Sequence, residues 1–274
     1  MPCYAQTNIQ LLNQLHRANY TADDLHLVRT AYELAMRLFC GQFRASGKTF
    51  IAHLVGTASV LGSLRVGAAL IAAGLLHAAY QSGDFGERAS GVTDAKRGRL
   101  KASIADQTDA RVAVEVEAYV FRYQCFSWGS QFISNYHRDI RTLSSLDREV
   151  LLMRLANELD DYLDLGILYQ RNEGRHWLSS PDYSGRMLIE MAGQLGFPAL
   201  GASLAQAFEQ VAEADYSPAR PGPDARSRSF LLAPLSYQRI VDGLATRLGG
   251  AAAAKATAQN AAEAAPLPGT KPAE

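Results

Sequence analysis

Two stretches of the chain carry side chains that could hold a metal ion or move a proton. The first contains His53 and His77, and the second spans residues 154–161. Two imidazoles and two carboxylates that converge from separate helices can bind one divalent ion, which lowers the pKa of a bound water. Both imidazoles are present, but Ala78 and Asn157 stand where a phosphohydrolase of this kind needs carboxylates. The sequence therefore predicts the frame of a metal site without its full set of acidic ligands.

Helical spacing of apolar residues dominates the segments that must position these side chains, and no segment predicts a strand. The capping pattern predicts a long helix that begins at Thr21 and ends at the Ser46-Gly47 loop, and another that begins at Ser144 or Ser145. Between and after them we expect four further helices: Phe50–Leu64, Val66–Tyr80, about Thr108–Arg122, and one that starts at Ser180-Pro181-Asp182. A last amphipathic helix is expected over Pro234–Leu248. The fold class predicted is all-α.

Composition indicates a globular protein with no nucleic-acid or membrane partner. The chain has 274 residues, a formal net charge of +0 and a hydrophobic share of 48%, so no global field draws it to a polyanion. Its most apolar segment, residues 66–76, has about 11 residues where a membrane span needs about 20. Three cysteines form no metal-ligand spacing and make an odd number. Because residues 1–14 also lack the features of a signal peptide, we expect a reducing, cytoplasmic compartment.

The motifs in these stretches resemble those of the HD superfamily, and most closely the hydrolase half of the RelA/SpoT-type enzymes that degrade guanosine tetraphosphate. That family reads approximately H-x-G-Q-x-R-K-S-G-x-P-Y-x-x-H, then L-L-H-D-x-x-E-D, then K-L-A-D-R-L-H-N. Here residues 40–53 read CGQFRASGKTFIAH, residues 75–82 read LLHAAYQS, and residues 154–161 read RLANELDD. The resemblance implies an HD-like helical bundle between about Ala31 and Leu165.

The resemblance also implies a metal held by His53, His77 and the residues at positions 78 and 157. Alanine at position 78 offers no ligand, and the neutral amide of Asn157 adds no charge to anchor an ion. Gln81 and Ser82 replace the acidic pair that would position the attacking water. We therefore expect no cofactor, and no standard pyrophosphohydrolysis.

Two neighbouring carboxylates leave an alternative open. Asp160 and Asp161 follow Asn157 by three and four positions, so they lie near the same helix face. Asp161 is the best substitute ligand, and a rearranged site for manganese or another divalent metal would use His53, His77, Asn157 and Asp161. Asp160 is interpreted as a solvated helix charge, and for Asp161 both interpretations stay open.

Basic residues near the first histidine suggest a ligand with phosphate groups. Arg44 and Lys48 match the loop that leans over the nucleotide in the resembled family, although an ordinary surface loop would look the same. A second basic cluster could cover a phosphorylated ligand, or it could be a solvated loop; it consists of Lys96, Arg97, Arg99 and Lys101.

Three functions from different classes therefore stay open. The leading hypothesis is a degenerate HD-domain protein that keeps the ancestral cleft and binds a small, phosphorylated or nucleotide-like ligand, with Arg44, Lys48 and Asp161 as ligand-binding residues. The first alternative is a metal-dependent phosphohydrolase with the rearranged site. The second is a biosynthetic enzyme in which His53, His77 and Tyr80 perform metal-free acid–base catalysis. A protein partner is also left open.

The expected organisation is a single HD-like domain with appendages. Residues 1–20 hold an N-terminal helix and residues 21–215 the helical domain. Residues 216–248 form a proline-rich loop and a C-terminal helix. Residues 249–274, rich in alanine and proline, form a disordered tail.

Overall fold

The computed structural model describes residues 3–87, 91–126, 140–169, 185–214 and 230–232. This part of the chain is almost entirely helical, which confirms the all-α fold class. Its elements follow one another in this order: α1 Asn8–Arg17, α2 Ala22–Leu38, β1 Gln42–Phe43, α3 Phe50–Ser63, α4 Ala68–Leu76, α5 Ala79–Ser82, α6 Asp94–Ala105, α7 Ala110–Cys125, a 3₁₀ turn Ile140–Thr142, α9 Ser145–Leu163, a 3₁₀ turn Gly166–Tyr169, α11 Gly185–Gln194, α12 Pro198–Glu213 and β2 Phe230–Leu231.

Side-chain caps fix where the main helices begin. The hydroxyls of Thr21, Thr49 and Ser144 each accept a hydrogen bond from a backbone N–H in the first turn of α2, α3 and α9. Such a cap satisfies a donor that has no partner within the helix, and it contributes about 1 kcal/mol. The predicted starts of these three helices are confirmed.

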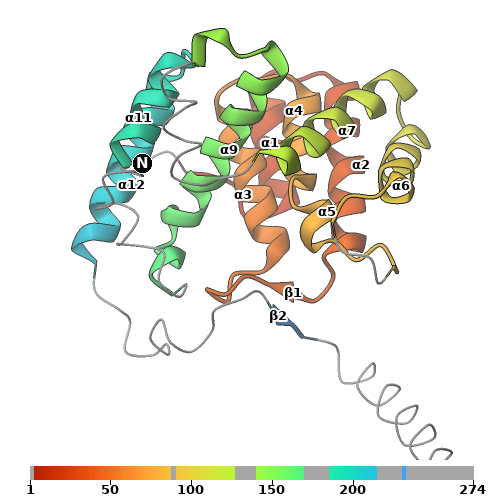
Figure 1. Ribbon diagram of the computed structural model, residues 1–274, viewed down its shortest axis with the longest axis horizontal. Helices are drawn as coiled ribbons and strands as arrows, with labels where there is room; N and C mark the ends of the chain where they lie inside the picture. Colours follow the sequence, from red (N-terminus) through yellow and green to blue (C-terminus); the bar gives the residue numbers. More distant parts are fainter. Residues whose placement is uncertain (1–2, 88–90, 127–139, 170–184, 215–229, 233–274) are drawn as a thin grey trace, which may run out of the picture. The chain divides into compact units, whose positions relative to one another are not determined.

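Helices α3, α4 and α9 form the centre of the bundle (Figure 1). Helix α3 packs against both α4 and α9, and α7 packs against α4 and α9 on another side. Nearly every residue of α4 is buried, as expected for a helix that is apolar on all faces. The site is therefore built from helices that are themselves held in the core.

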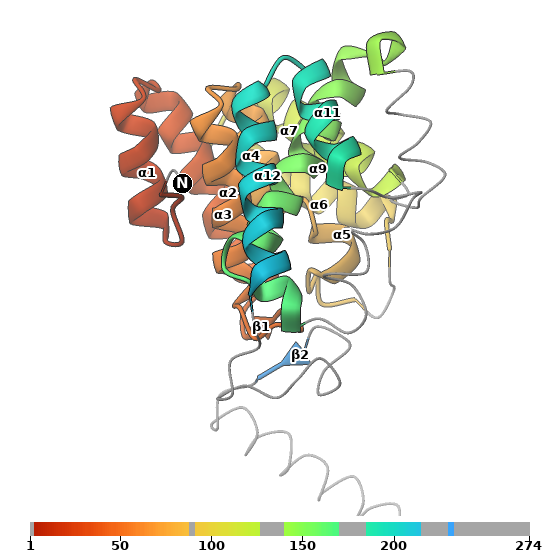
Figure 2. The same ribbon diagram turned by 90° about the vertical axis from the view of Figure 1, so that its left-hand side faces the viewer.

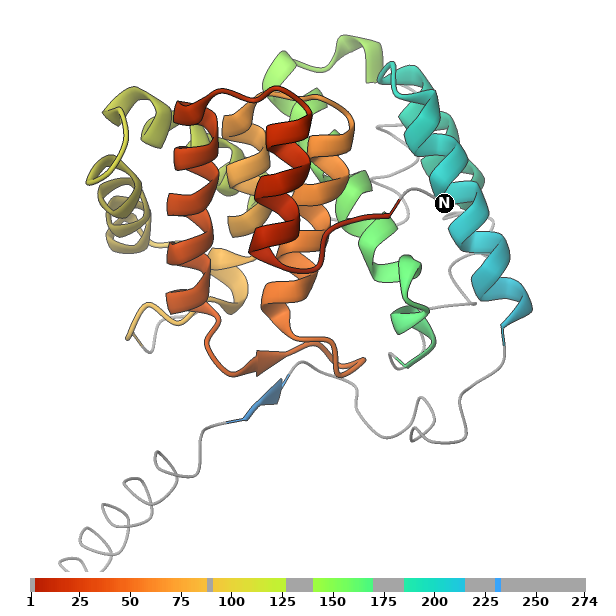
Figure 3. The same cartoon turned by 180° about the vertical axis from the view of Figure 1, so that it is seen from behind.

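Two further layers cover this centre. Helix α1 packs against α2 and α3, and it is seen from behind in Figure 3. Helices α11 and α12 lie side by side and pack against α9 (Figure 2). Within the described ranges, no helix is both long and apolar enough to cross a membrane.

The prediction that no segment forms a strand is wrong. Strand β1 pairs antiparallel with β2, and the rings of Phe43 and Phe230 stack with their centroids 5.3 Å apart. Each strand has two residues, which is too short for an alternating pattern to be visible in the sequence. The first long helix also ends earlier than expected, at Leu38, and Phe39 beyond it is buried and stacks on Phe50.

The predicted helix Val66–Tyr80 is interrupted at His77. The ring Nδ1 of His77 lies 2.8 Å from the Gly74 carbonyl oxygen, and the His77 carbonyl accepts a hydrogen bond from Gln124 Nε2 at 2.8 Å. These contacts satisfy polar groups that a continuous helix would pair differently. The break places α4 before the histidine and α5 after it.

The basic cluster at residues 96–101 lies on α6, so its interpretation as a loop is wrong. Its charges face partners in the fold: Arg97 pairs with Glu117, and Arg99 pairs with Glu87. The predicted helix start at Ser180–Asp182, the helix over 234–248 and the tail from 249 lie outside the described residues.

Candidate functional site

His53 and His77 meet in the core, where α3 faces the end of α4. Their ring centroids are 5.2 Å apart with the ring planes at 77°, and both side chains are buried. His53 lies in the first turn of α3, and His77 follows the last residue of α4. The structure thus brings together two imidazoles that are far apart in the sequence.

Asp160 belongs to the same group, and its interpretation as a solvated charge is wrong. It is fully buried, and its carboxylate lies 2.8 Å from His53 Nδ1. Lys48 Nζ donates to both carboxylate oxygens, at 3.0 and 2.9 Å. Because these donors satisfy the carboxylate, the charge is tolerated away from water.

Room for Asp160 comes from Gly56, a residue that sequence reasoning missed. A Cβ atom built on Gly56 would lie 1.8 Å from Asp160 Oδ1, so no larger residue fits without displacing the carboxylate. Glycine within a helix costs about 1 kcal/mol relative to alanine. A glycine three positions after a histidine on an apolar helix was the signal available in the sequence.

Two basic side chains reach the cluster from the tight turn between β1 and α3. The turn is closed by two backbone hydrogen bonds, from Arg44 N–H to the Lys48 carbonyl and from Gly47 N–H to the Arg44 carbonyl. Gly47 adopts a φ of +87° that other residues rarely take. Arg44 donates to the Asp161 carboxylate, and its Nη1 lies 3.3 Å from His53 Nε2. We call Arg44, Lys48, His53, His77, Asp160 and Asp161 the histidine cluster.

The hydrogen bonds and the neighbouring charges indicate the charge state and the tautomer of the His53 ring. Burial and the neighbouring Arg44 charge lower the pKa of His53 to about 3. A neutral ring donates from Nδ1 to Asp160 and presents the lone pair of Nε2 to Arg44. Burial also lowers the pKa of His77 well below its ordinary value. Both imidazoles are therefore neutral at physiological pH.

The charged groups of the cluster stabilise one another. Burial alone would lower the pKa of Lys48, but Asp160 and Asp164 raise it above its ordinary value. Burial raises the pKa of Asp160, and the Lys48 ammonium opposes that rise. The cluster is thus a set of mutually dependent charges, in which removal of one leaves another unpaired.

The carboxylates that a metal ion would need in this arrangement are paired with cations. His53, Asp160 and Asp161 offer ligand atoms within 4.8 Å of one another. The cations of Lys48 and Arg44, however, already neutralise the two carboxylates. Ala78 is buried and adds no ligand, whereas buried Asn157 hydrogen-bonds His53 through its side chain.

Several contributors to the site were not assigned a role from the sequence. The ring of Tyr123 packs on His77 with centroids 5.0 Å apart, and its hydroxyl accepts a hydrogen bond from Arg154 Nη1 at 2.6 Å. Gln6 forms a side-chain hydrogen bond with Asp160. No spacing rule links positions 6 and 123 to the motifs, so only the tertiary structure identifies them.

Tyr80 lies in a different group of contacts from the predicted partners His53 and His77. Its hydroxyl donates to Glu117 Oε1 at 2.9 Å, and Arg97 holds both oxygens of the same carboxylate. We call Tyr80, Glu117 and Arg97 the tyrosine cluster. Burial raises the pKa of Tyr80 far above its ordinary value, which makes the hydroxyl a poor proton donor at neutral pH.

Comparison with known proteins adds one partial match. A family model described as a domain of unknown function (DUF6817) matches residues 34–125, which is less than half of the chain. The matched part contains Arg44, Lys48 and both histidines, but it ends before α9. No curated protein matches the chain.

Proposed function

We propose that this chain is a degenerate relative of the HD superfamily that binds a small ligand with phosphate groups at the histidine cluster, without metal-dependent pyrophosphohydrolysis. The observation that carries the proposal is that the cations of the cluster are more exposed to solvent than the groups beneath them. His53 and Asp160 are fully buried, whereas the side chains of Arg44 and Lys48 keep exposed fractions of 18% and 12%. The two cations are therefore accessible from solvent, as is the 15% exposed Asp161 side chain, whereas the layer beneath them is closed.

An approaching phosphate would meet these cations before the fully buried Asp160 carboxylate. Guanidinium and ammonium groups are well suited to phosphate oxygens, and charge-assisted hydrogen bonds are the strong ones. Asp164 contacts Lys48 at 3.3 Å and is 47% exposed, so it is the partner that an anion displaces most easily. The neutral imidazoles beneath add hydrogen-bonding groups without adding charge.

The fold relationship is part of the same proposal. Its support is that the glycine, arginine and histidine positions of the resembled motif fall together around one cluster, although α9 joins it from a distant part of the chain. The cytoplasmic compartment expected from the cysteines stays a prediction.

The proposal is tested by thermal unfolding of the full chain in EDTA with pyrophosphate, guanosine diphosphate and guanosine tetraphosphate. A ligand at a hundred times its Kd stabilises the native state by about 2.7 kcal/mol, so we expect a saturable rise in Tm. Arg44→Gln and Lys48→Gln should abolish that rise. Arg29→Gln, which removes an exposed cation paired with Glu33, is the matched control and should leave it unchanged. The absence of any rise with all three probes would contradict the proposal.

A second candidate function, a phosphohydrolase with a rearranged metal site, is favoured by the His53, Asp160 and Asp161 group. The same variants separate the two candidates, because their effects have opposite signs. If a divalent ion is the true occupant, Arg44→Gln and Lys48→Gln free the carboxylates and should strengthen stabilisation by Mn²⁺. If a phosphate ligand is the occupant, they only weaken binding.

A further inference from the structure

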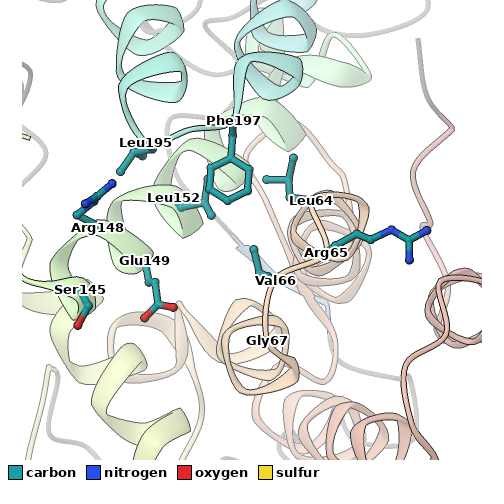
Figure 4. Close-up of a pocket in the computed structure, with 10 residues that line it drawn as sticks. All are labelled: Leu64, Arg65, Val66, Gly67, Ser145, Arg148, Glu149, Leu152, Leu195 and Phe197. Atoms are coloured by element: carbon teal, nitrogen blue, oxygen red, sulfur yellow. The ribbon is translucent and has the colours of Figure 1, made fainter. Parts of the chain in front are cut away.

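A cavity lies at the opposite ends of the helices that build the histidine cluster. It has a volume of about 380 Å³, and its walls come from the α3–α4 loop, the first turns of α9 and the α11–α12 turn (Figure 4). Leu64 follows His53 by eleven positions, and Glu149 precedes Asp160 by eleven, which corresponds to roughly 16 Å along either helix. The cavity is therefore separate from the proposed phosphate site.

One wall of the cavity is apolar. Figure 4 shows the Phe197 ring between Leu152 and Leu64, with Val66 and Leu195 nearby. The volume is within the range of about 300–1,000 Å³ that is typical of small-molecule sites, which are mostly apolar with a few placed polar groups. This wall suits an aliphatic or aromatic group of limited size.

The other wall carries two opposite charges on α9. Glu149 is half-buried, and Tyr119 donates to its Oε2 at 2.7 Å, so one oxygen of the carboxylate is fixed in place. The neighbouring Arg148 is exposed, and within the described part of the chain its guanidinium makes no ion pair. Consecutive residues on a helix point in different directions, so the two charges do not neutralise each other directly.

The third charged residue at the cavity, Arg65, hydrogen-bonds to a group outside the cavity. Arg65 Nη1 donates to the Ala18 carbonyl at 2.7 Å, and Figure 4 shows its guanidinium directed away from the other labelled side chains. The backbone of the same loop is held by Tyr20, whose hydroxyl donates to the Val66 carbonyl at 2.7 Å. The loop that forms this wall is thus fixed before any ligand binds.

We infer that this cavity binds a small zwitterion with an apolar side chain, such as a hydrophobic amino acid. The ammonium group would pair with Glu149 and the carboxylate with Arg148, while the side chain would lie against Phe197 and Leu152. A zwitterion can pair with both charges on one wall while its side chain contacts the apolar wall. A simple amine or a simple acid can pair with only one of the two charges. The inference does not depend on the phosphate site.

Three probes with the same apolar body but different charge test the inference on the full chain. L-Phenylalanine carries both charges, phenethylamine only the positive one, and 3-phenylpropionate only the negative one. By titration calorimetry we expect L-phenylalanine to bind at least about tenfold more tightly than either of the others, because each of them leaves one charged group of the site unpaired.

Two variants should each weaken the binding of L-phenylalanine and leave the affinity of a different control probe unchanged. Glu149→Gln should weaken L-phenylalanine about tenfold without changing 3-phenylpropionate, and Arg148→Gln should weaken it without changing phenethylamine. Arg186→Gln, on an 85% exposed side chain of α11, should change nothing. Gly67→Leu places a side chain where an added Cβ meets no atom within 4 Å, and it should weaken all three probes. No saturable binding of L-phenylalanine, or equal affinity for the three probes, would overturn the inference.

Discussion

Asp160 and Glu117 are both carboxylates buried among helices, and each is held by one cation and at least one neutral donor. Glu117 is held by Arg97 and the Tyr80 hydroxyl, and the group ends there. Asp160 is held by Lys48 and His53, but its group continues to a second carboxylate, a second cation and a second imidazole. One carboxylate with two donors is enough to fix a helix contact. The additional polar groups around Asp160 exceed what packing requires, which is why the histidine cluster is the better candidate for function.

The largest expected difference between the two carboxylates is in stability. Asp160→Asn leaves the Lys48 ammonium, whose side chain is only 12% exposed, without its main counter-charge, so we expect a loss of about 3–5 kcal/mol in the free energy of unfolding. Glu117→Gln should cost less, about 1–3 kcal/mol, because the 30% exposed Arg97 side chain can turn towards water. Urea unfolding of both variants measures this difference. Equal losses would show that the two clusters are equivalent structural pairs.

The two clusters should also differ in their response to acid. The pKa of His53 in the folded state is about 3, below the unfolded value of 6.5, so the unfolded chain binds more protons between these values. Stability is therefore fully present above pH 6.5 and is lost as the pH falls, by about 2 kcal/mol for His53 at pH 5.

The control for this acid effect is His77→Leu, in which Asp160 and His53 are kept. Since the folded-state pKa of His77 is also lowered, its removal should make the loss of Tm between pH 7 and pH 5 smaller than in the parent chain. An unchanged pH dependence would indicate that His77 is protonated in the folded state.

A pair of glycine variants separates the close approach at the histidine cluster from ordinary helix propensity. Gly56→Ala should destabilise the fold by about 1–3 kcal/mol, because the new Cβ would overlap Asp160. Gly98→Ala on α6 meets no atom within 4 Å, so it should stabilise by about 0.5–1 kcal/mol. Denaturant midpoints of the two variants should therefore shift in opposite directions. A neutral Gly56→Ala would mean that the carboxylate can move aside freely.

The smallest expected effect concerns hydrolysis. We expect no Mn²⁺-dependent hydrolysis of guanosine tetraphosphate by the parent chain, nor by the Ala78→Asp, Asn157→Asp double variant. The double variant adds two carboxylates and should bind Mn²⁺ more tightly, but Gln81 and Ser82 still provide no acidic group to position water. Product analysis by chromatography checks both, and clear turnover by the parent chain would contradict the proposed function.

The starts of the helices could be predicted from the sequence because they depend on hydrogen bonds between residues that are close in the chain. Thr21 and Ser144 cap α2 and α9 through hydrogen bonds to residues three positions on, which a sequence shows directly. The break at His77 depends on the Gln124 side chain, and the burial of Asp160 depends on Lys48 and Gly56. These contacts join distant segments, so no periodicity predicts them. The two histidines were identified as candidates by the motif, whereas the arginine and lysine contacts that neutralise the aspartates became clear only in three dimensions.

The short ladder between β1 and β2 has a consequence for biosynthesis. Gln42 pairs with Leu231, and Phe43 pairs with Phe230, so the turn that carries Arg44 lacks its strand partner until nearly all of the described chain has emerged from the ribosome. Contacts between neighbouring helices form early, while pairings of large sequence separation form late. During translation the helical bundle therefore assembles before the turn that carries Arg44 and Lys48 receives its final support.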